Sequence, residues 1–170
     1  IGAVDGQGRI LWGDQLMILL ASDVLKEIPG ATIIADVKAS QTLFDEVARM
    51  GGKPLMWRTG HSLIKAKMAE TKAPLAGEMS GHIFFADKWD GFDDGIYASI
   101  RLLEMLSDHE TYEEILNDLP ISVTTPEINI PFSGNNHFTF MKLFAKLTKF
   151  DNASIIDIDG LKIIYPDGWA

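Results

Sequence analysis

The chain has 170 residues, of which 15 are Lys or Arg, 24 are Asp or Glu and none is Cys, so its formal net charge at pH 7 is −9. The absence of cysteine excludes disulfide scaffolds, thiolate zinc sites and cysteine nucleophiles, and it is compatible with a reducing, cytoplasmic location. The negative charge argues against nucleic acid as a partner, and no apolar run approaches the roughly 18 residues that cross a membrane. We therefore expect one globular domain, or one and a half.

The first 30 residues predict a hairpin followed by a helix. Apolar residues over 1–4 and 9–12 flank the turn Asp5-Gly6-Gln7-Gly8, whose single carboxylate is too few for a hard cation and is typical of a hairpin turn. Asp14 can cap a helix that runs to about residue 28, where Pro29-Gly30 ends it. Because the chain opens on an apolar strand, we expect it to be part of a longer polypeptide.

From residue 31 to residue 85, short apolar strands alternate with helices. Strands are expected over residues 31–35, 54–57, 75–76 and 83–85, and helices over 43–50 and, capped by Ser62, to about residue 71. Strands that alternate with helices favour parallel pairing through right-handed crossovers. The predicted fold is therefore α/β, with a mixed, largely parallel sheet and flanking helices.

The remaining elements come after the acidic segment 87–94. Asp93 and Asp94 stand directly before a predicted helix, where capping and the helix dipole explain them. The apolar faces of the helices are expected to be core, and in this helix the face consists of Ile96, Ile100, Leu103 and Leu106. The string Thr111-Tyr-Glu-Glu114 fits a capping box that starts another helix. A proline-rich connector over 120–137, an amphipathic helix over 138–150 and a hairpin over 155–165 complete the chain.

Polar residues follow the successive strands of the predicted sheet. In open α/β sheets ligands bind outside the carboxyl ends of the strands, so these residues are the candidate site. Cations and histidines suit a phosphate, and carboxylate, hydroxyl and glycine residues suit sugar hydroxyls. The candidates are Lys38 after one strand, Arg58 and His61 after the next, and Glu78, Ser80 and His82 in the glycine-flanked loop 77–82. Together they indicate an anionic polyol such as a phosphosugar.

Each candidate also has a structural interpretation. Lys38 can be a solvated surface charge, Arg58 can pair with a neighbouring acid, and His61 can pack at a helix start. Glu78 and Ser80 can serve the turn that contains them. His109 and His137 have polar surroundings and are read as surface residues. The site hypothesis therefore depends on the three clusters meeting in space.

Several segments resemble one known family, the α-D-phosphohexomutases, and within it the bacterial phosphomannomutase/phosphoglucomutase branch. The matching strings occur in family order across most of residues 1–125, and the most specific of them resembles the sugar-binding loop of the third of four domains. They are Trp12-Gly-Asp-Gln-Leu16, Asp36-Val-Lys38, Thr59-Gly-His-Ser62, Gly77-Glu-Met-Ser-Gly-His82 and Gly91-Phe-Asp-Asp-Gly95.

The resemblance implies an enzyme that interconverts hexose 1-phosphate and hexose 6-phosphate through an enzyme phosphoserine and a bisphosphorylated sugar. It assigns the sugar hydroxyls to Glu78 and Ser80, and proton transfer or a phosphate contact to His82. Met79 in the loop favours the mannose/glucose branch over the glucosamine branch. The implied substrate-binding residues are Lys38, His61, Glu78, Met79, Ser80, Gly81 and His82, and the implied catalytic residue is His82.

The resemblance also divides the chain into parts of domains. Residues 1–12 match the end of a preceding domain, 13–125 a sugar-binding α/β domain, 126–135 a linker and 136–170 the start of an incomplete α+β domain. The Mg²⁺ ligands and the phosphoserine of the family belong to segments outside these residues, so the chain alone is expected to be inactive. Glucose or mannose 1,6-bisphosphate is the implied activator and intermediate, and the parent enzyme is implied to be a monomer.

Two other functions remain open from the sequence. The chain could be a non-catalytic module that binds sugar phosphates, or a structural interaction domain whose polar strand ends are merely solvated. A serine loop and an aspartate-rich loop upstream in the reading frame would favour the mutase over the module. An unchanged affinity for hexose phosphate after Glu78→Ala would favour the structural domain.

Overall fold

The computed structural model describes residues 1–107, 112–117, 119–120, 123, 125, 128–134 and 136–170. Two compact units divide the chain, the first over residues 1–121 and the second over residues 122–170. The predicted linker 126–135 includes residues 126, 127 and 135, which lie outside the described part of the chain. The finer division into domains therefore stays a prediction.

The first unit begins with an antiparallel hairpin of β1 (Ala3–Val4) and β2 (Ile10–Leu11), as its turn residues predict. The Asp5 carboxylate closes the turn, because its Oδ1 accepts hydrogen bonds from the backbone N–H groups of Gln7 at 2.9 Å and Arg9 at 2.7 Å. The Arg9 side chain pairs with the other carboxylate oxygen. The interpretation of this carboxylate as a turn residue is confirmed.

A four-stranded sheet in the order β4-β3-β5-β6 forms the centre of the first unit. β3 (Thr32–Asp36), β4 (Lys53–Trp57) and β5 (Leu75–Gly77) are parallel, and β6 (Ile83–Phe85) pairs with β5 in the antiparallel sense. The register pairs Asp36 with Trp57 and Ala35 with Gly77, so the three parallel strands end at the same edge of the sheet. The predicted mixed, largely parallel sheet is confirmed.

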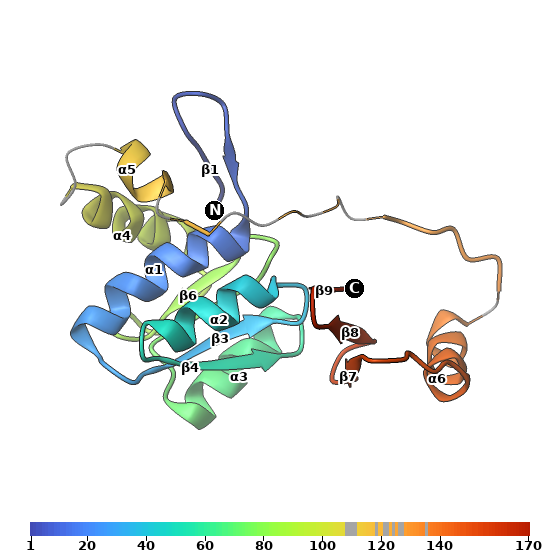
Figure 1. Cartoon of the computed structure of the whole chain (residues 1–170). Coiled ribbons are helices and arrows are strands. Elements are labelled where there is room, and N and C mark those ends of the chain that lie inside the picture. The colour runs from blue at the N-terminus through green and yellow to red at the C-terminus, as the bar shows by residue number, and fades with distance from the viewer. Residues whose placement is uncertain (108–111, 118, 121–122, 124, 126–127, 135) are drawn as a thin grey trace. The chain divides into compact units, whose positions relative to one another are not determined.

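Helices cover both faces of this sheet (Figure 1). α1 (Gly13–Glu27), α2 (Gln41–Arg49) and α4 (Gly95–Ser107) share one hydrophobic core with Ile33 of β3. α3 (His61–Thr71) buries Ile64 and Met68 against Ile34 of the same strand. Because neighbouring residues of a strand point to opposite faces, α3 lies on the other side of the sheet from α1, α2 and α4.

Two predicted helix caps are each wrong by two residues, because Trp12 and Gly60 occupy the cap positions. α1 begins at Gly13, so Asp14 lies inside its first turn, and the backbone N–H of Trp12 donates instead to Gln15 Oε1 at 3.1 Å. α3 begins at His61, so Ser62 lies within the helix. Gly60 precedes α3 with a φ of 128°, a conformation that side-chain-bearing residues rarely adopt. This glycine lets the chain turn sharply from β4 into α3.

The predicted core face of α4 is also wrong. Ile96, Ile100 and Leu103 are 78%, 56% and 64% exposed, and only Leu106 of the predicted face packs partly against the core. The residues of α4 that are buried are Ala98, Arg101, Leu102 and Met105. The helix is therefore rotated so that an arginine points inward and an isoleucine stripe points outward.

Ion pairs of Arg101 explain this rotation. Its Nη1 donates to Asp87 Oδ1 at 2.9 Å and Oδ2 at 2.7 Å, and its Nη2 donates to Asp23 Oδ2 on α1 at 3.1 Å. The guanidinium also lies 4.5 Å from the centre of the Phe85 ring. The Arg101 and Asp87 side chains are each 4% exposed, and buried charges of this kind require partners. The inward face of α4 is thus set by charge pairing and not by the hydrophobic stripe.

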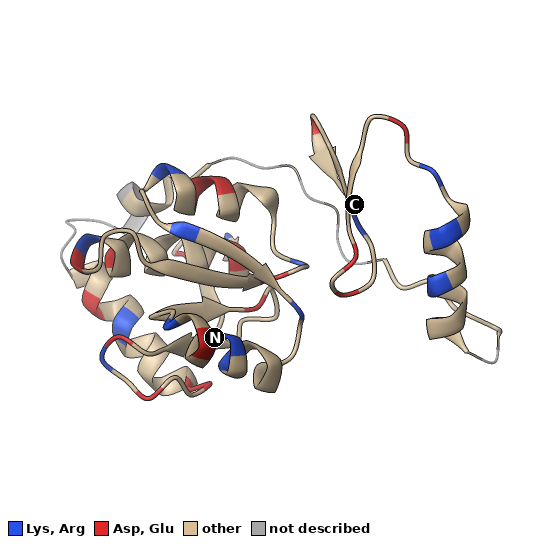
Figure 2. Ribbon diagram, turned by 90° about the horizontal axis from the view of Figure 1, so that it is seen from below, with Lys and Arg blue, Asp and Glu red and all other residues tan. Residues whose placement is uncertain are grey.

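α5 (Tyr112–Asn117) completes the first unit and buries Ile115 and Leu116 in the main core. The predicted cap Thr111 and the predicted surface residue His109 lie outside the described residues. Among those residues, no helix is both long and apolar enough to span a membrane. Basic and acidic residues are interspersed over the ribbon of this unit (Figure 2).

The second unit contains α6 (His137–Leu147) and an antiparallel sheet of β7 (Ser154–Ile156), β8 (Lys162–Tyr165) and β9 (Gly168–Trp169). The helix is capped by Asn136, whose Oδ1 accepts from Thr139 N at 3.0 Å. The predicted terminal hairpin is confirmed, and β9 extends it. No residue of α6 is buried, so its expected core face is not found within residues 136–170.

We predict that Arg101→Met lowers the free energy of unfolding by about 3–5 kcal/mol, because it leaves the buried Asp87 and the partly exposed Asp23 without their cation. Lys88→Met is the matched control, since the Lys88–Glu27 pair is about half exposed on both sides and contributes little. Urea unfolding of the chain measures both. Equal effects of the two substitutions would contradict the assigned role of Arg101.

Candidate functional site

The candidate site lies at the edge where the three parallel strands end. β3, β4 and β5 are followed by the loops 37–40, 58–60 and 78–82, which carry the polar residues that the sequence analysis selected. The strand register brings the three strand ends side by side. This edge is the ordinary place for a ligand in an open α/β sheet.

The Glu78 carboxylate joins two of these loops. Its Oε1 accepts a hydrogen bond from Gly60 N at 2.6 Å, and its Oε2 accepts one from Ser80 Oγ at 3.3 Å. Glu78 is only 5% exposed, whereas its partners Gly60 and Ser80 are half-buried and exposed, so both contacts are partly buried. A hydrogen bond from a backbone amide to a carboxylate is stronger than one between neutral groups. Glu78 therefore holds the start of α3 against its own loop.

Asp36 joins the same loop to the end of β3. Its Oδ1 accepts from Met79 N at 3.2 Å, whereas its Oδ2 is buried and has no hydrogen-bond partner among the described residues. The pKa of Asp36 is raised from its ordinary value of 3.8 to about 6, and burial is the largest cause. The negative charge of Glu78 also raises this pKa, whereas the hydrogen bond from the Met79 amide and the positive charge of Lys38 lower it. Near neutral pH this carboxyl group can therefore hold or release a proton.

Two glycines allow the loop 78–82 to pack closely against neighbouring backbone. A Cβ on Gly13, at the start of α1, would lie 2.5 Å from the Met79 carbonyl oxygen and 2.7 Å from the Glu78 carbonyl oxygen. A Cβ on Gly81, which has a φ of 90°, would lie 2.3 Å from the carbonyl oxygen of Ile1. Backbone from α1 and from the N-terminus thus confines the loop 78–82 on two sides.

His82 pairs with an acidic residue that the sequence analysis read as a cap. Its Nδ1 lies 2.6 Å from Asp93 Oδ2, and the two side chains are 53% and 35% exposed. An antiparallel bridge between Phe84 and Asp93 brings the segment after β6 back beside that strand and toward His82. The contact turns Nδ1 toward Asp93 and leaves Nε2 on the other side of the ring. This arrangement suits proton transfer at Nε2.

The neighbouring Asp94 is the cap of α4. Its Oδ1 accepts from Ile96 N and Tyr97 N, both at 3.0 Å. The capping prediction is therefore confirmed for Asp94 and wrong for Asp93. Asp93 and Asp94 are adjacent in sequence but have different partners. Asp94 caps α4, whereas Asp93 contacts His82 because its segment folds back beside β6.

The cationic candidates lie exposed on the same edge. Lys38 is on the loop after β3, Arg58 follows β4 directly, and His61 is the first residue of α3, next to the amide that Glu78 holds. Among the predicted substrate-binding residues, Ser80 and His82 are exposed, Met79 is half-buried, and Glu78 and Gly81 are buried. They follow the carboxyl ends of three adjacent parallel strands, Lys38 and the residues 78–82 on loops and His61 at the start of α3, and their joint role in binding stays a prediction.

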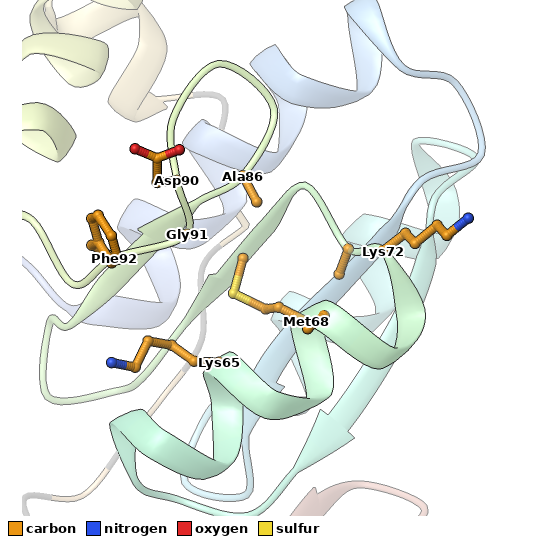
Figure 3. A pocket seen from close by; sticks show the side chains of 9 residues that line it. Lys65, Met68, Lys72, Ala86, Asp90, Gly91 and Phe92 are labelled. Atoms are coloured by element: carbon orange, nitrogen blue, oxygen red, sulfur yellow. The ribbon is translucent and has the colours of Figure 1, made fainter.

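A surface cavity of about 360 Å³ lies elsewhere, between α3 and the segment after β6. Met68 and Ala86 contribute to its apolar lining, and none of the strand-end residues lines it. Figure 3 shows that the side chains of Lys65 and Lys72 extend from α3 in opposite directions, so their amines do not converge on one anion. This cavity lacks the convergent polar groups of a sugar-phosphate site.

Four residues of the site were not given a functional role by the sequence analysis: Gly13, Asp36, Gly60 and Asp93. Asp36 ends a buried strand two residues before Lys38, so the strand-end rule that selected Lys38 could also have selected it. The contacts of Gly13, Gly60 and Asp93 join segments distant in the sequence, and no local pattern indicates them.

Comparison with known proteins identifies close relatives of the whole chain. A family model described as phosphoglucomutase/phosphomannomutase, alpha/beta/alpha domain III, matches residues 12–122. The phosphomannomutase/phosphoglucomutase of Pseudomonas aeruginosa is 45% identical over 170 residues, and the phosphoglucomutase of Neisseria meningitidis serogroup A is 48% identical over 172 residues. Each match covers 99% of this chain and 37% of the relative, so the chain spans little more than a third of these proteins.

Solved structures agree with the fold. The crystal structure of a phosphoglucomutase/phosphomannomutase family protein from Burkholderia thailandensis superposes with a TM-score of 0.92 at 47% identity, covering 99% of this chain and 36% of that one. A putative phosphomannomutase from Thermus thermophilus has a TM-score of 0.69 at 17% identity, over 99% of this chain and 36% of that one, and it supports the fold alone.

We predict that Gly13→Ala lowers the free energy of unfolding by about 1–3 kcal/mol, because the new methyl group overlaps the backbone carbonyls of the loop 78–82. Gly95→Ala is a matched control at the start of another helix, where the methyl group meets only Ile1 at 3.6 Å. Chemical unfolding and the amide resonances of residues 78–82 measure the effect. An undisturbed loop in Gly13→Ala would contradict the tight packing described above.

We also predict that Asp36→Asn changes how stability depends on pH. Because the pKa of Asp36 is raised by folding, its contribution is present below about pH 4 and is lost as the pH rises through about 6. Asparagine cannot ionise, so relative to the unsubstituted chain the variant should gain about 2 kcal/mol between pH 4.5 and pH 8. Unfolding curves at the two pH values test this, and a stability difference that does not change with pH would contradict it.

Proposed function

The chain belongs to the phosphoglucomutase/phosphomannomutase family, and we propose that it forms the sugar-recognising part of an enzyme that interconverts hexose 1-phosphate and hexose 6-phosphate. In this proposal the reaction proceeds through an enzyme phosphoserine and a bisphosphorylated hexose, with the phosphoserine supplied from outside these 170 residues. The observation that carries the proposal is the buried Glu78 carboxylate between the loops after β4 and β5.

Glu78 and Ser80 bind the hydroxyl groups of the sugar. An ionised carboxylate offers about four lone-pair positions, and the contacts with Gly60 and Ser80 occupy two of them. The remaining positions can accept hydrogen bonds from adjacent hydroxyls of a hexose. Ser80 is exposed and can donate to, or accept from, the same sugar. Because the backbone fixes Glu78 in advance, little ordering is needed when the sugar binds.

Lys38 and His61 bind the phosphate group of the sugar. Lys38 lies on the loop after the central strand β3, and His61 begins the helix that follows the neighbouring strand β4. A local pair of donors can attract an anion even though the whole chain has a net charge of −9, since the field near a site depends mainly on nearby groups. The edge of the sheet thus provides donors for phosphate beside acceptors for hydroxyls.

His82 transfers the proton in this proposal. As a sugar hydroxyl oxygen forms its bond to the phosphoserine phosphorus, the serine O–P bond breaks, its electron pair goes to the leaving serine oxygen, and His82 Nε2 takes the hydroxyl proton. Asp93 touches Nδ1 at 2.6 Å and stabilises the imidazolium that results. In the second half-reaction the proton returns to the sugar oxygen whose phosphate is transferred back to serine.

Magnesium is the metal ion that the resemblance implies for the parent enzyme. No three His, Asp or Glu side chains gather among them in a way that could hold a metal ion. The described residues therefore do not provide a site for the ion.

In this proposal the hexose is mannose or glucose. The relatives with identities of 45–49% are called phosphomannomutase/phosphoglucomutase or phosphoglucomutase. A probable phosphoglucosamine mutase from Thermococcus gammatolerans is 29% identical over 99% of the chain. These names agree with the mannose/glucose character that the resemblance implies for Met79.

The proposal is tested in the full-length protein that carries this chain, with glucose 1-phosphate and mannose 1-phosphate as substrates. We predict that His82→Ala lowers kcat by about 10²–10⁴-fold, the range typical of a lost general acid–base. KM should change less, because the phosphate and hydroxyl contacts remain. Added imidazole should restore part of the activity. His137→Ala, at an exposed residue of α6, is the control and should leave both constants unchanged.

Two results would contradict the proposal. Full activity of His82→Ala would remove the proton-transfer role, and hexose phosphate binding without any turnover by the full-length protein would favour a non-catalytic sugar-phosphate module.

Asp93→Asn should retain the binding of substrate and lower kcat by a smaller factor than His82→Ala, since it weakens only the support of the imidazolium.

A further inference from the structure

The connection 86–92 between β6 and Asp93 determines whether Asp93 reaches His82. The connection folds back sharply, because Gly91, with a φ of 74°, donates its backbone N–H to the carbonyl oxygen of the last residue of β6 at 2.7 Å. The contact with His82 itself is made by two side chains that are 53% and 35% exposed. Exposed ion pairs contribute little unless their geometry is held by other contacts. The His82–Asp93 contact therefore depends on how firmly the connection is held.

A buried ion pair holds the beginning of this connection. Both carboxylate oxygens of Asp87 accept hydrogen bonds from Arg101 Nη1, at 2.9 Å and 2.7 Å, and the two side chains are each 4% exposed. Nη2 of the same guanidinium donates to Asp23 on α1 at 3.1 Å. The connection is thereby tied to α4 and α1 at once. Buried charges resist separation, since each one alone would lack a partner.

An aromatic stack holds the middle of the connection. The ring of Trp89 lies on the ring of Tyr97 in α4, with the ring centres 4.7 Å apart and the planes 10° from parallel. Tyr97 also meets Phe85 of β6 edge-on at 5.5 Å, and the Arg101 guanidinium lies 5.9 Å from its ring centre. Stacked aromatic pairs are more favourable than their buried area alone predicts. Together, Asp87, Trp89, Tyr97 and Arg101 form one group, which we call the anchor cluster.

We propose that the anchor cluster positions the His82–Asp93 pair. By fixing the connection 86–92, it keeps the Asp93 carboxylate against His82 Nδ1, and it thereby keeps the neutral ring in the tautomer whose Nε2 can accept a proton. Trp89 and Arg101 are positioning residues in this account, because they act on His82 only through Asp93. The part that concerns catalysis rests on the proposed function, which assigns proton transfer to His82.

Other contacts near Asp93 have a different part in this account. The bridge to β6 and the cap formed by Asp94 fix the backbone at residues 93 and 94. The anchor cluster acts earlier, on residues 87 and 89, and so sets the direction from which the chain arrives at Asp93. Lys88 lies between these two residues and pairs with Glu27, but both side chains are about half exposed. Lys88 is therefore a matched control within the same connection.

Nitrogen-15 NMR of the His82 ring in the chain without any sugar tests the positioning role. Above about pH 8.5, where imidazole rings are ordinarily neutral, the unsubstituted chain should show mainly the Nδ1–H tautomer. Trp89→Leu removes the stack and should lower the ratio of Nδ1–H to Nε2–H tautomer by about 2–10-fold, the range expected for the loss of one hydrogen bond. Trp89→Phe retains a ring that can stack on Tyr97 and should restore most of the ratio. Lys88→Met should leave the ratio unchanged.

An unchanged ratio in Trp89→Leu, or an equal fall in Lys88→Met, would overturn the proposal. If Trp89→Leu does not fold, Arg101→Lys provides the second test. Lysine retains the positive charge, but a single ammonium group does not reproduce the fork with which the guanidinium holds Asp87 and Asp23 together. Arg101→Lys should also lower the ratio, and an unchanged ratio in this variant would equally overturn the proposal.

The consequence for catalysis is measured in the full-length protein with glucose 1-phosphate. Trp89→Leu should lower kcat and leave KM nearly unchanged. The double variant Trp89→Leu/Asp93→Asn should match Asp93→Asn within about twofold, because both substitutions remove the same contact. Effects that instead multiply would overturn the catalytic part, since they would show that Trp89 acts independently of Asp93. Absence of any turnover by the unsubstituted full-length protein would contradict the proposed function, and the tautomer ratio tests the anchor cluster independently of that result.

Discussion

The hydrogen bond from Gly60 N to the Glu78 carboxylate connects two loops that the sheet by itself only brings near each other. Parallel strands fix where loops begin, but they do not fix the path that the loops follow afterwards. One buried carboxylate, 5% exposed, converts two adjacent strand ends into one surface because it accepts from the start of α3 and from Ser80 at once. The position of His61, which follows Gly60 directly, depends on the same contact.

Close backbone packing makes this surface rigid. The start of α1 approaches the loop 78–82 so closely that only glycine fits at residue 13, and the backbone of the N-terminal residue Ile1 packs against Gly81 on another side. Asp36 adds a buried carboxyl group whose pKa is raised by burial to about 6. A site of this kind combines a fixed position for Glu78 with one group whose charge can change.

Hydrophobic periodicity and turn residues were sufficient to predict the α/β fold, the hairpins and the order of the elements. They were insufficient for α4, where the apolar stripe of Ile96, Ile100 and Leu103 is exposed because Arg101 is drawn inward by Asp87 and Asp23. The strand-end rule found Lys38, His61 and Glu78 on one edge. It could not separate Asp93 from Asp94, since the partner of Asp93 is reached only through the fold-back along β6. Contacts between distant segments are not encoded in any local pattern.

The most direct test of the central claim is an NMR titration of the isotope-labelled chain with glucose 1-phosphate, with inorganic phosphate as a reference ligand. If the three strand-end loops form one sugar-phosphate surface, the largest amide shifts should cluster at residues 38, 60–61 and 78–82, and the shifts at 78–82 should require the sugar. Shifts that instead gather around Lys65, Lys72 and Phe92 at the cavity beside α3, with the loop 78–82 unperturbed, would contradict the account.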